Sequence, residues 1–583
     1  MSIQSMRSSK IQTFGLLVVI IVGAFLLRSY SLPDRGIQFL DETIYYGQPA
    51  SMATHIRWWM SGEGANLSVD QQRLSLMRAI EKVRGLPGGW LTDKPFYGLM
   101  AVIIYTLFGP SPSLFLIINA FLGATTAGLV YFLGRKLGQD KVAALFSAIA
   151  LALSGFHMLW SRTGFTHVSA TFFLTLGLLS YAHTTWSKTK HPSRWLLAAG
   201  ICLGAGTGSH IVSSLFAGAC FFTEAYRSIQ QKKYRQGLIN LALLGAGTGI
   251  VLIGLHILTW WTGNTISSSF PWLYGENPTS YFAGLFHHKL ELNRHQSSGV
   301  FYSPGLMTSA LLRMPFLYGE GVFYSSIFLI GLAATIVRFL KKWRDSDLFI
   351  LIGVLIPILI ISTIRLLPLL PRNLSPMAPF SALFVGSVLA FLWNRAPSKA
   401  LRWALVGIFT VIQLSHSAYL FGIHSGYAGA ATWLSQNGNE EATLLTEQYR
   451  SRFWYVNGVK NVYFMGQDKT GRKWAKKMPW ENITEIPDKT RKQFAGIIGS
   501  EVVSMPDSLK IWPSRLERNT PEARFTNTRS FTIKKLEIIQ GILGIARLAG
   551  LNSLVKRMEF ELAKERRVEK REAVSLYRLL PRK

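Results

Sequence analysis

Long apolar runs separated by short polar segments fill roughly the first 420 residues of the chain. Each run is close to the length at which a helix crosses about 30 Å of hydrocarbon. A shorter apolar run at 96–108 predicts a re-entrant or interfacial helix. The longer runs predict eleven transmembrane helices, at 11–27, 112–134, 142–159, 168–186, 195–209, 211–226, 238–261, 323–340, 348–364, 376–394 and 402–421.

Basic residues gather in the short segments between these runs. The clusters lie at 135–141, 188–194, 227–235, 338–344 and 395–402. Short loops rich in Lys and Arg remain in the cytoplasm, so this pattern predicts a cytoplasmic N-terminus and an extracytoplasmic C-terminus. The chain has 62 Lys and Arg against 31 Asp and Glu. Their distribution between apolar runs favours a membrane protein over one that binds nucleic acid.

The pattern changes after residue 421. Short β-rich runs at 442–445, 453–456 and 462–464 alternate with polar turns and precede another run at 494–503. Residues 533–567 then carry apolar side chains at helical spacing among basic ones, which fits a helix on anionic headgroups or one packed on its own domain. We predict two domains. They are a transmembrane domain over 1–421, with outer loops 28–111 and 262–322, and a soluble extracytoplasmic α/β domain with a basic helical segment over 422–583.

Two neighbouring acids, Asp41 and Glu42, follow the first predicted span. Carboxylates close to hydrocarbon are costly enough to indicate a function, and a carboxylate within hydrogen-bond reach of an acceptor can act as a general base. Asp41 is the first candidate; the alternative is a loop carboxylate that pairs with Arg35 or caps a short helix. Glu42 either takes a catalytic or acceptor-orienting role or forms a salt bridge that holds the loop.

Basic side chains at the outer ends of the spans are candidates for binding a phosphate. Guanidinium groups match phosphate oxygens bidentately, and arginines are less expected on the outer face. Lys94, just before Pro95, either meets the phosphate or reaches lipid headgroups. The donor-phosphate candidates are Lys94, Arg162, Arg365 and Arg372, with Arg372 preferred.

Further side chains on this face are acceptor-site or auxiliary candidates, although lone histidines at helix ends are more often structural. No cluster has metal-ligand spacing, so we predict no metal site and no certain cofactor; a divalent cation has no support in the sequence. The glycine-rich stretch 204–208 lies inside an apolar run and predicts a helix–helix contact rather than a phosphate loop. The auxiliary candidates are Tyr45, His167, His210, Glu276 and Glu320.

Five motifs follow one another in order along the chain, at 41–46, 90–97, 129–138, 161–163 and 370–376. This order resembles the dolichyl-phosphate-mannose protein mannosyltransferases and their bacterial relative, the lipid A aminoarabinose transferase. The resemblance implies the C-type glycosyltransferase fold over roughly residues 10–420 and a sugar donor carried on a polyprenyl phosphate. Phe96, His167 and His210 differ from residues common in that family, which leaves the sugar and any metal dependence open.

Together these observations predict an integral membrane glycosyltransferase of a bacterial cytoplasmic (inner) membrane. It would move a hexosyl or pentosyl monosaccharide from a polyprenyl-phosphate donor to an envelope acceptor on the outer face. Asp41 would act as general base, with inversion if no covalent intermediate forms. The expected partners are the lipid-linked donor and membrane lipids, with a lipid, glycan or protein acceptor. The alternatives are a polytopic transporter or lipid flippase and a non-catalytic membrane scaffold.

Overall fold

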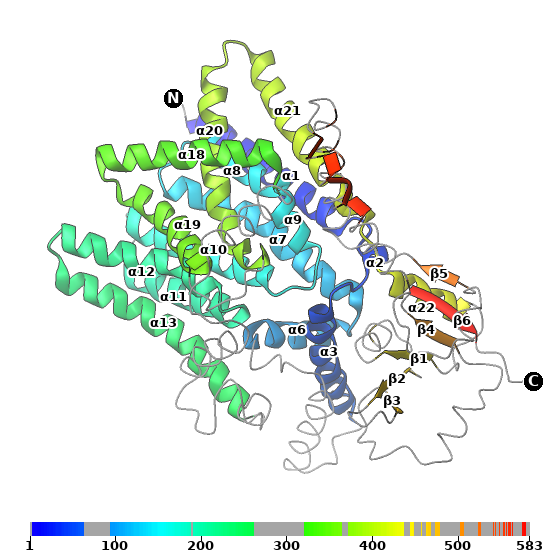
Figure 1. Cartoon of the computed structure of the whole chain (residues 1–583). Helices are drawn as coiled ribbons and strands as arrows, with labels where there is room; N and C mark the ends of the chain where they lie inside the picture. The colour runs from blue at the N-terminus through cyan, green and yellow to red at the C-terminus, as the bar shows by residue number, and fades with distance from the viewer. Residues whose placement is uncertain are drawn as a thin grey trace, which may run out of the picture. The chain divides into compact units, whose positions relative to one another are not determined.

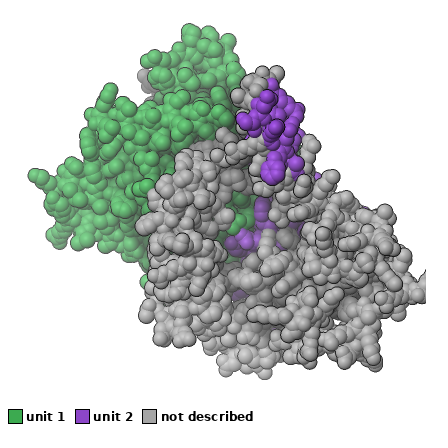
Figure 2. All heavy atoms as spheres, in the orientation of Figure 1, with its two compact units in different colours: residues 1–30, 87–104, 116–418 green, residues 31–86, 105–115, 419–583 purple. Residues whose placement is uncertain are grey.

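A computed structural model describes residues 3–62, 94–187, 190–261, 320–363 and 371–436, together with six strands and scattered helical residues beyond them (Figure 1). The chain divides into two compact units, which Figure 2 shows in different colours. Unit 1 comprises residues 1–30, 87–104 and 116–418, and unit 2 comprises 31–86, 105–115 and 419–583. Residues 31–86 are therefore grouped with the C-terminal segment. The predicted boundary at residue 421 stays a prediction.

Every one of the eleven predicted runs falls on a helix, and the run at 142–159 falls on a bent pair. Unit 1 holds most of the helical residues. The helices are α1 (Ile3–Ser29), α6 (Pro95–Phe108), α7 (Pro112–Lys136), α8 (Lys141–Leu153), α9 (Gly155–Ser161), α10 (His167–Trp186), α11 (Pro192–Ser209), α12 (Ser213–Gln230), α13 (Tyr234–Trp261), α18 (Gly321–Lys342), α19 (Asp345–Thr363), the 3-10 helix η2 (Pro371–Met377), α20 (Ala378–Arg395) and α21 (Lys399–Ser417).

Six of the described helices contain stretches long and apolar enough to cross a membrane, namely α1, α7, α13, α18, α20 and α21. The bent pair α8 and α9 makes a seventh if it is counted as one span. The helices α10, α11, α12 and α19 are not among them, so a total of eleven spans stays a prediction. The short run at 96–108 is the apolar helix α6, which has 14 residues.

Glycine lets the backbones of unit 1 approach one another closely. A Cβ atom added at Gly200 of α11 would lie 2.3 Å from the carbonyl oxygen of Leu244 in α13. One added at Gly204 would lie 2.9 Å from the carbonyl oxygen of Thr248. Apolar helices in lipid gain much of their association from such close packing. The interpretation of residues 204–208 as a helix–helix contact is therefore confirmed at Gly204.

Unit 2 combines helices with one six-stranded mixed sheet. The strands run in the order β3-β2-β1-β4-β6-β5, with β1 parallel to both β2 and β4 and the other pairs antiparallel. The helix α22 packs against β5 and β6 (Figure 1). These elements are α2 (Leu32–Arg35), α3 (Leu40–Met60), the 3-10 helix η3 (Ala418–Gly422), α22 (Gly426–Gln436), β1 (Leu444–Glu447), β2 (Val462–Gln467), β3 (Lys473–Lys477), β4 (Val502–Met505), β5 (Ala523–Phe525) and β6 (Val574–Arg578).

Three of the β-rich runs overlap these strands: 442–445 overlaps β1, 462–464 overlaps β2, and 494–503 reaches β4. The run at 453–456 lies mostly outside the described residues. The parallel neighbours of β1 require crossover connections. That arrangement agrees with the α/β character expected of the C-terminal segment, while its status as a separate domain stays a prediction.

Candidate active site

The two acids of the first outer loop lie in the first turn of the helix α3, where the sequence predicted a loop. Oε2 of Glu42 accepts hydrogen bonds from the backbone N–H groups of Gln38 and Phe39 at 2.8 and 2.9 Å. Its Oε1 pairs with Nη2 of Arg35 at 3.0 Å, and both side chains are buried. A glutamate in the first helical turn that reaches back to the preceding N–H groups caps that helix. Both carboxylate oxygens of Glu42 are thus engaged in holding the start of α3.

Asp41 lies next to Glu42 but faces another side of the helix, because successive positions on a helix do not share a face. It is half-buried. Tyr45, also half-buried, follows one turn later, and residues at this spacing are neighbours on the helix surface. Of the two acids, Glu42 makes the salt bridge with Arg35. Asp41 and Tyr45 lie along one face of α3.

Other candidate residues meet in unit 1 around His167, the first residue of α10. The imidazole rings of His167 and His210 lie with their centroids 3.9 Å apart. Nε2 of His167 is 3.2 Å from Oδ1 of Asn373. The charges of Arg372 and Lys94 also act on this imidazole. The fold therefore brings together four segments that are far apart in the sequence, and we call this group the His167 cluster.

The two basic side chains of the His167 cluster lie in different surroundings. The guanidinium carbon of Arg372 lies 4.5 Å from the centre of the Phe165 ring, a cation–π contact. Lys94 is only 4% exposed, which is unusual for a lysine. Gathered cations attract an anion, and charge-assisted hydrogen bonds to phosphate are among the strong ones. The chemistry of the His167 cluster is that of an anion-binding site.

Arg162 lies elsewhere in unit 1. Its Nη1 donates to the backbone carbonyl oxygens of Leu27, Arg28 and Tyr30 at 3.2, 3.2 and 2.7 Å. Carbonyls at the end of a helix lack partners within that helix, and these belong to the end of α1 and the residue just beyond it. Arg162 therefore ties the end of α9 to the end of α1.

The remaining candidates are either buried in polar contacts or outside the described residues. Glu320 is buried, and its carboxyl group accepts a hydrogen bond from the hydroxyl of Ser154. Arg365 and Glu276 lie outside the residues that the structure describes. Among the described residues, no three His, Cys, Asp or Glu side chains are grouped so that they could hold a metal ion.

The sequence did not point to three polar residues that shape these sites. Asn119 donates to the carbonyl oxygens of Thr163 and Phe165 at 2.6 and 3.0 Å and so shapes the turn before His167. Asn373 follows Arg372 inside a motif that had been noted for its arginine. Arg28 is a cation at the end of an apolar run, and this position in the sequence could have marked it as a candidate.

Comparisons with known proteins give one family match and several structural matches. The model of the dolichyl-phosphate-mannose-protein mannosyltransferase family matches residues 87–216, a range that includes Lys94, His167 and His210. No curated protein matches the chain. The matched range covers less than a quarter of the chain.

Among solved structures, ArnT of Cupriavidus metallidurans, bound to undecaprenyl phosphate, matches with a TM-score of 0.55 at 14% identity. The match covers 88% of this chain and 96% of that one, and at this identity it shows a shared fold. The oligosaccharyltransferase of Archaeoglobus fulgidus, tethered with an acceptor peptide, gives a TM-score of 0.47 at 13% identity over 77% of this chain. This chain spans 63% of that longer protein.

Proposed function

We propose that the protein is an integral membrane glycosyltransferase that moves one hexose or pentose from a polyprenyl phosphate to an acceptor of the cell envelope. The observation that carries this proposal is the His167 cluster, because a buried lysine, a half-buried arginine and two imidazoles suit the phosphate of a lipid-linked sugar. ArnT, which shares the fold, was solved with undecaprenyl phosphate. Three members of the cluster also lie in the range matched by the mannosyltransferase family model.

Arg372 and Lys94 are the proposed ligands of the donor phosphate. Arginine offers a planar fork that matches two phosphate oxygens, and lysine adds a compact charge. Such groups stabilise the negative charge that develops on the phosphate as it leaves. His167 and His210 are proposed to line the same site. The carbonyl bonds of Arg162 favour a structural role for that residue, and Arg365 stays a prediction.

Asp41 is the proposed general base. It takes the proton from the acceptor hydroxyl or amine while a bond forms between the acceptor and the anomeric carbon. The bond from that carbon to the phosphate oxygen breaks in the same step, and the electron pair leaves with the polyprenyl phosphate. One in-line displacement inverts the anomeric carbon. Glu42 holds the start of α3, and Tyr45 on the face of Asp41 is proposed to orient the acceptor.

The step is proposed to take place on the outer face of the membrane, as the distribution of basic clusters predicts. A transporter or lipid flippase is the alternative favoured by one observation, the bent pair α8 and α9. Transporters build their substrate sites from broken helices of this kind. A scaffold without catalysis is the third possibility.

One reconstitution separates these functions. The purified protein is placed in liposomes with a radiolabelled polyprenyl-phosphate sugar and an envelope extract as the source of acceptor. A transferase moves the label into the extract and releases free polyprenyl phosphate. A flippase moves the intact labelled lipid to the other leaflet, and a scaffold does neither. Either of the last two results would contradict the proposal.

The Asp41→Asn variant tests the base. The amide keeps the volume of the side chain but cannot take the proton, so transfer should fall by about 10²–10⁴. Expression and the thermal unfolding midpoint should stay close to wild type. Glu42→Gln is the matched control and should lower the unfolding midpoint while reducing transfer less. Wild-type turnover by Asp41→Asn would remove Asp41 from the mechanism, and a larger loss in Glu42→Gln would exchange the two roles.

A further inference from the structure

The helices α8 and α9 form one apolar stretch that bends by 54° at Ser154. A break of this kind leaves the last carbonyls of the first helix and the first N–H groups of the second without helical partners. Inside a membrane no water is at hand to satisfy them, so side chains must do so. The contacts of these backbone groups show which side chains satisfy them.

Charged and polar side chains meet both sides of the break. On the α8 side, Arg28 donates through Nη1 to the carbonyl oxygen of Ala152 at 2.9 Å and through Nη2 to that of Leu151 at 3.1 Å. On the α9 side, the carboxyl group of Glu320 accepts hydrogen bonds from backbone N–H groups of α9 and from the hydroxyl of Ser154. A cation thus lies at the C-terminal end of one helix and an acid at the N-terminal end of the next, as the helix dipoles favour.

Both side chains are buried, since Arg28 is 0% and Glu320 4% exposed, and the two interact electrostatically. Glu320 directly precedes α18. Burial raises the pKa of its carboxyl to about 8, against the opposing effects of its hydrogen bonds and of the Arg28 charge. In either protonation state its oxygens can accept from the N–H groups of α9. An unbroken helix would need neither buried ionisable group. The stability of the fold alone therefore does not explain the break.

The helix on the far side of the break leads to the His167 cluster. With seven residues α9 is roughly 10 Å long. It ends at Arg162, which is bound to the carbonyls at the end of α1, the same helix that carries Arg28. The turn held by Asn119 follows, and then His167 begins α10. The position of the break therefore sets the position of one side of the cluster.

We propose that Glu320 is a positioning residue for the donor-phosphate site. By holding the N-terminus of α9 across from Arg28, it fixes the short helix and turn that carry His167, and it ties the start of α18 to that site. This inference rests on the proposed function, because the His167 cluster must bind the phosphate for its geometry to matter. It assigns Glu320 a role different from the acceptor contact expected from its place in the second outer loop.

The test measures binding of undecaprenyl phosphate to the full-length protein in nanodiscs, by the change in tryptophan fluorescence, beside the thermal unfolding midpoint. Glu320→Gln keeps the volume but turns one acceptor oxygen into a donor facing the N–H groups of α9. We expect about tenfold weaker binding with an unfolding midpoint within a few degrees of wild type. Ser154→Ala removes a smaller part of the same contact and should weaken binding a few-fold.

Glu224→Gln is the matched control, because it makes the same change at another buried glutamate of unit 1. It should lower the unfolding midpoint and leave the affinity unchanged. Wild-type affinity in both Glu320→Gln and Ser154→Ala would overturn the inference, and so would an equal loss in Glu224→Gln, which would show a general loss of rigidity. If the wild-type protein does not bind undecaprenyl phosphate, that result contradicts the proposed function. It then also contradicts the inference, which rests on that function.

Discussion

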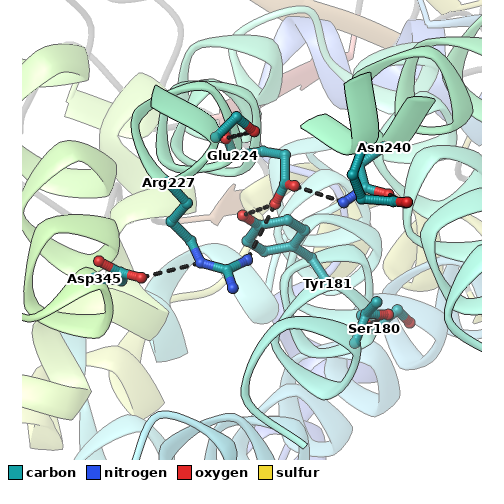
Figure 3. Close-up of polar contacts among 9 residues, drawn as sticks. Ser180, Tyr181, Glu224, Arg227, Asn240 and Asp345 are labelled. Atoms are coloured by element: carbon teal, nitrogen blue, oxygen red, sulfur yellow. Dashed lines mark hydrogen bonds and ion pairs between the residues drawn. The ribbon is translucent and has the colours of Figure 1, made fainter. Parts of the chain in front are cut away.

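The helix α10 carries a buried polar cluster at each end, and the two are built differently. Near its C-terminal end the hydroxyl of Tyr181 donates to Glu224 at 3.0 Å (Figure 3). Glu224 also accepts from Asn240 at 2.7 Å and from Arg227 at 3.3 Å, and Arg227 donates to Asp345 at 3.0 Å. Acid and base alternate through this network, which we call the Glu224 cluster. It joins α10, α12, α13 and α19.

The His167 cluster lies at the other end, roughly 21 Å away along the helix. There, two cations, Arg372 and Lys94, come together beside the paired imidazoles, with contacts to a phenylalanine ring and an amide. In the Glu224 cluster Arg227 contacts the carboxylates of both Glu224 and Asp345, so each charged group has a partner of opposite sign, as in a structural tie between helices. The comparison teaches that burial of a charged group does not by itself mark a site, whereas neighbouring cations suit an anionic ligand.

The strongest test of the comparison is whether the two ends of α10 face opposite sides of the membrane. Ser187 follows α10 and accepts a hydrogen bond from Lys136 of a basic cluster. In Ser187→Cys the thiol should be fully protected from an impermeant maleimide in intact spheroplasts and should react after permeabilisation. In Asn437→Cys it should react in intact spheroplasts.

The native cysteines should add little background in this experiment, since Cys202 is half-buried and Cys220 is buried. Labelling of the Ser187→Cys protein in intact spheroplasts would reverse the predicted path of the chain and place the Glu224 cluster on the outer face.

A structural role for the Glu224 cluster predicts a large effect on stability. Glu224→Ala should lower the free energy of unfolding by about 3 kcal/mol, because it removes one partner from a buried ionic network. The affinity for the lipid-linked donor should not change. The measurement is thermal unfolding in detergent together with donor KM.

Glu559→Ala is the control for that loss, because its salt bridge with Arg547 is exposed and should contribute at most about 1 kcal/mol. A Glu224→Ala protein of wild-type stability and weakened donor affinity would make the Glu224 cluster the functional one.

A binding role for the His167 cluster predicts a smaller, selective effect. Arg372→Lys keeps the charge but loses the planar fork, so the apparent affinity for the donor should fall about tenfold while acceptor KM stays constant. Arg338→Lys is the matched control, since Arg338 makes a two-point contact with Asp347, with Nε to Oδ2 at 2.8 Å. An unchanged donor affinity in Arg372→Lys would move the phosphate site to Lys94, Arg365 or Arg162.

The helices were predictable because their signal is local. An apolar run of sufficient length must satisfy its backbone hydrogen bonds as a helix in a membrane, and each predicted run falls on helical residues here, the run at 142–159 on a bent pair. The short helix α6 and the strands β1 and β2 were also within reach of the local pattern. The bend at Ser154 was not predicted, although the pair Ser154-Gly155 is of the kind at which helices kink.

For the candidate sites, the sequence by itself determined which residue types are present near the predicted outer face: two neighbouring acids, a lysine before a proline, and arginines at helix ends. Only the tertiary structure decided their partners. In the structure Glu42 pairs with Arg35, and Arg162 binds the end of α1. Glu320 lies against the break before α9, and Arg372 and Lys94 lie close to His167. The reason is physical: helix formation depends on neighbours along the chain, whereas the pairing of a buried charge depends on which distant helix packs beside it.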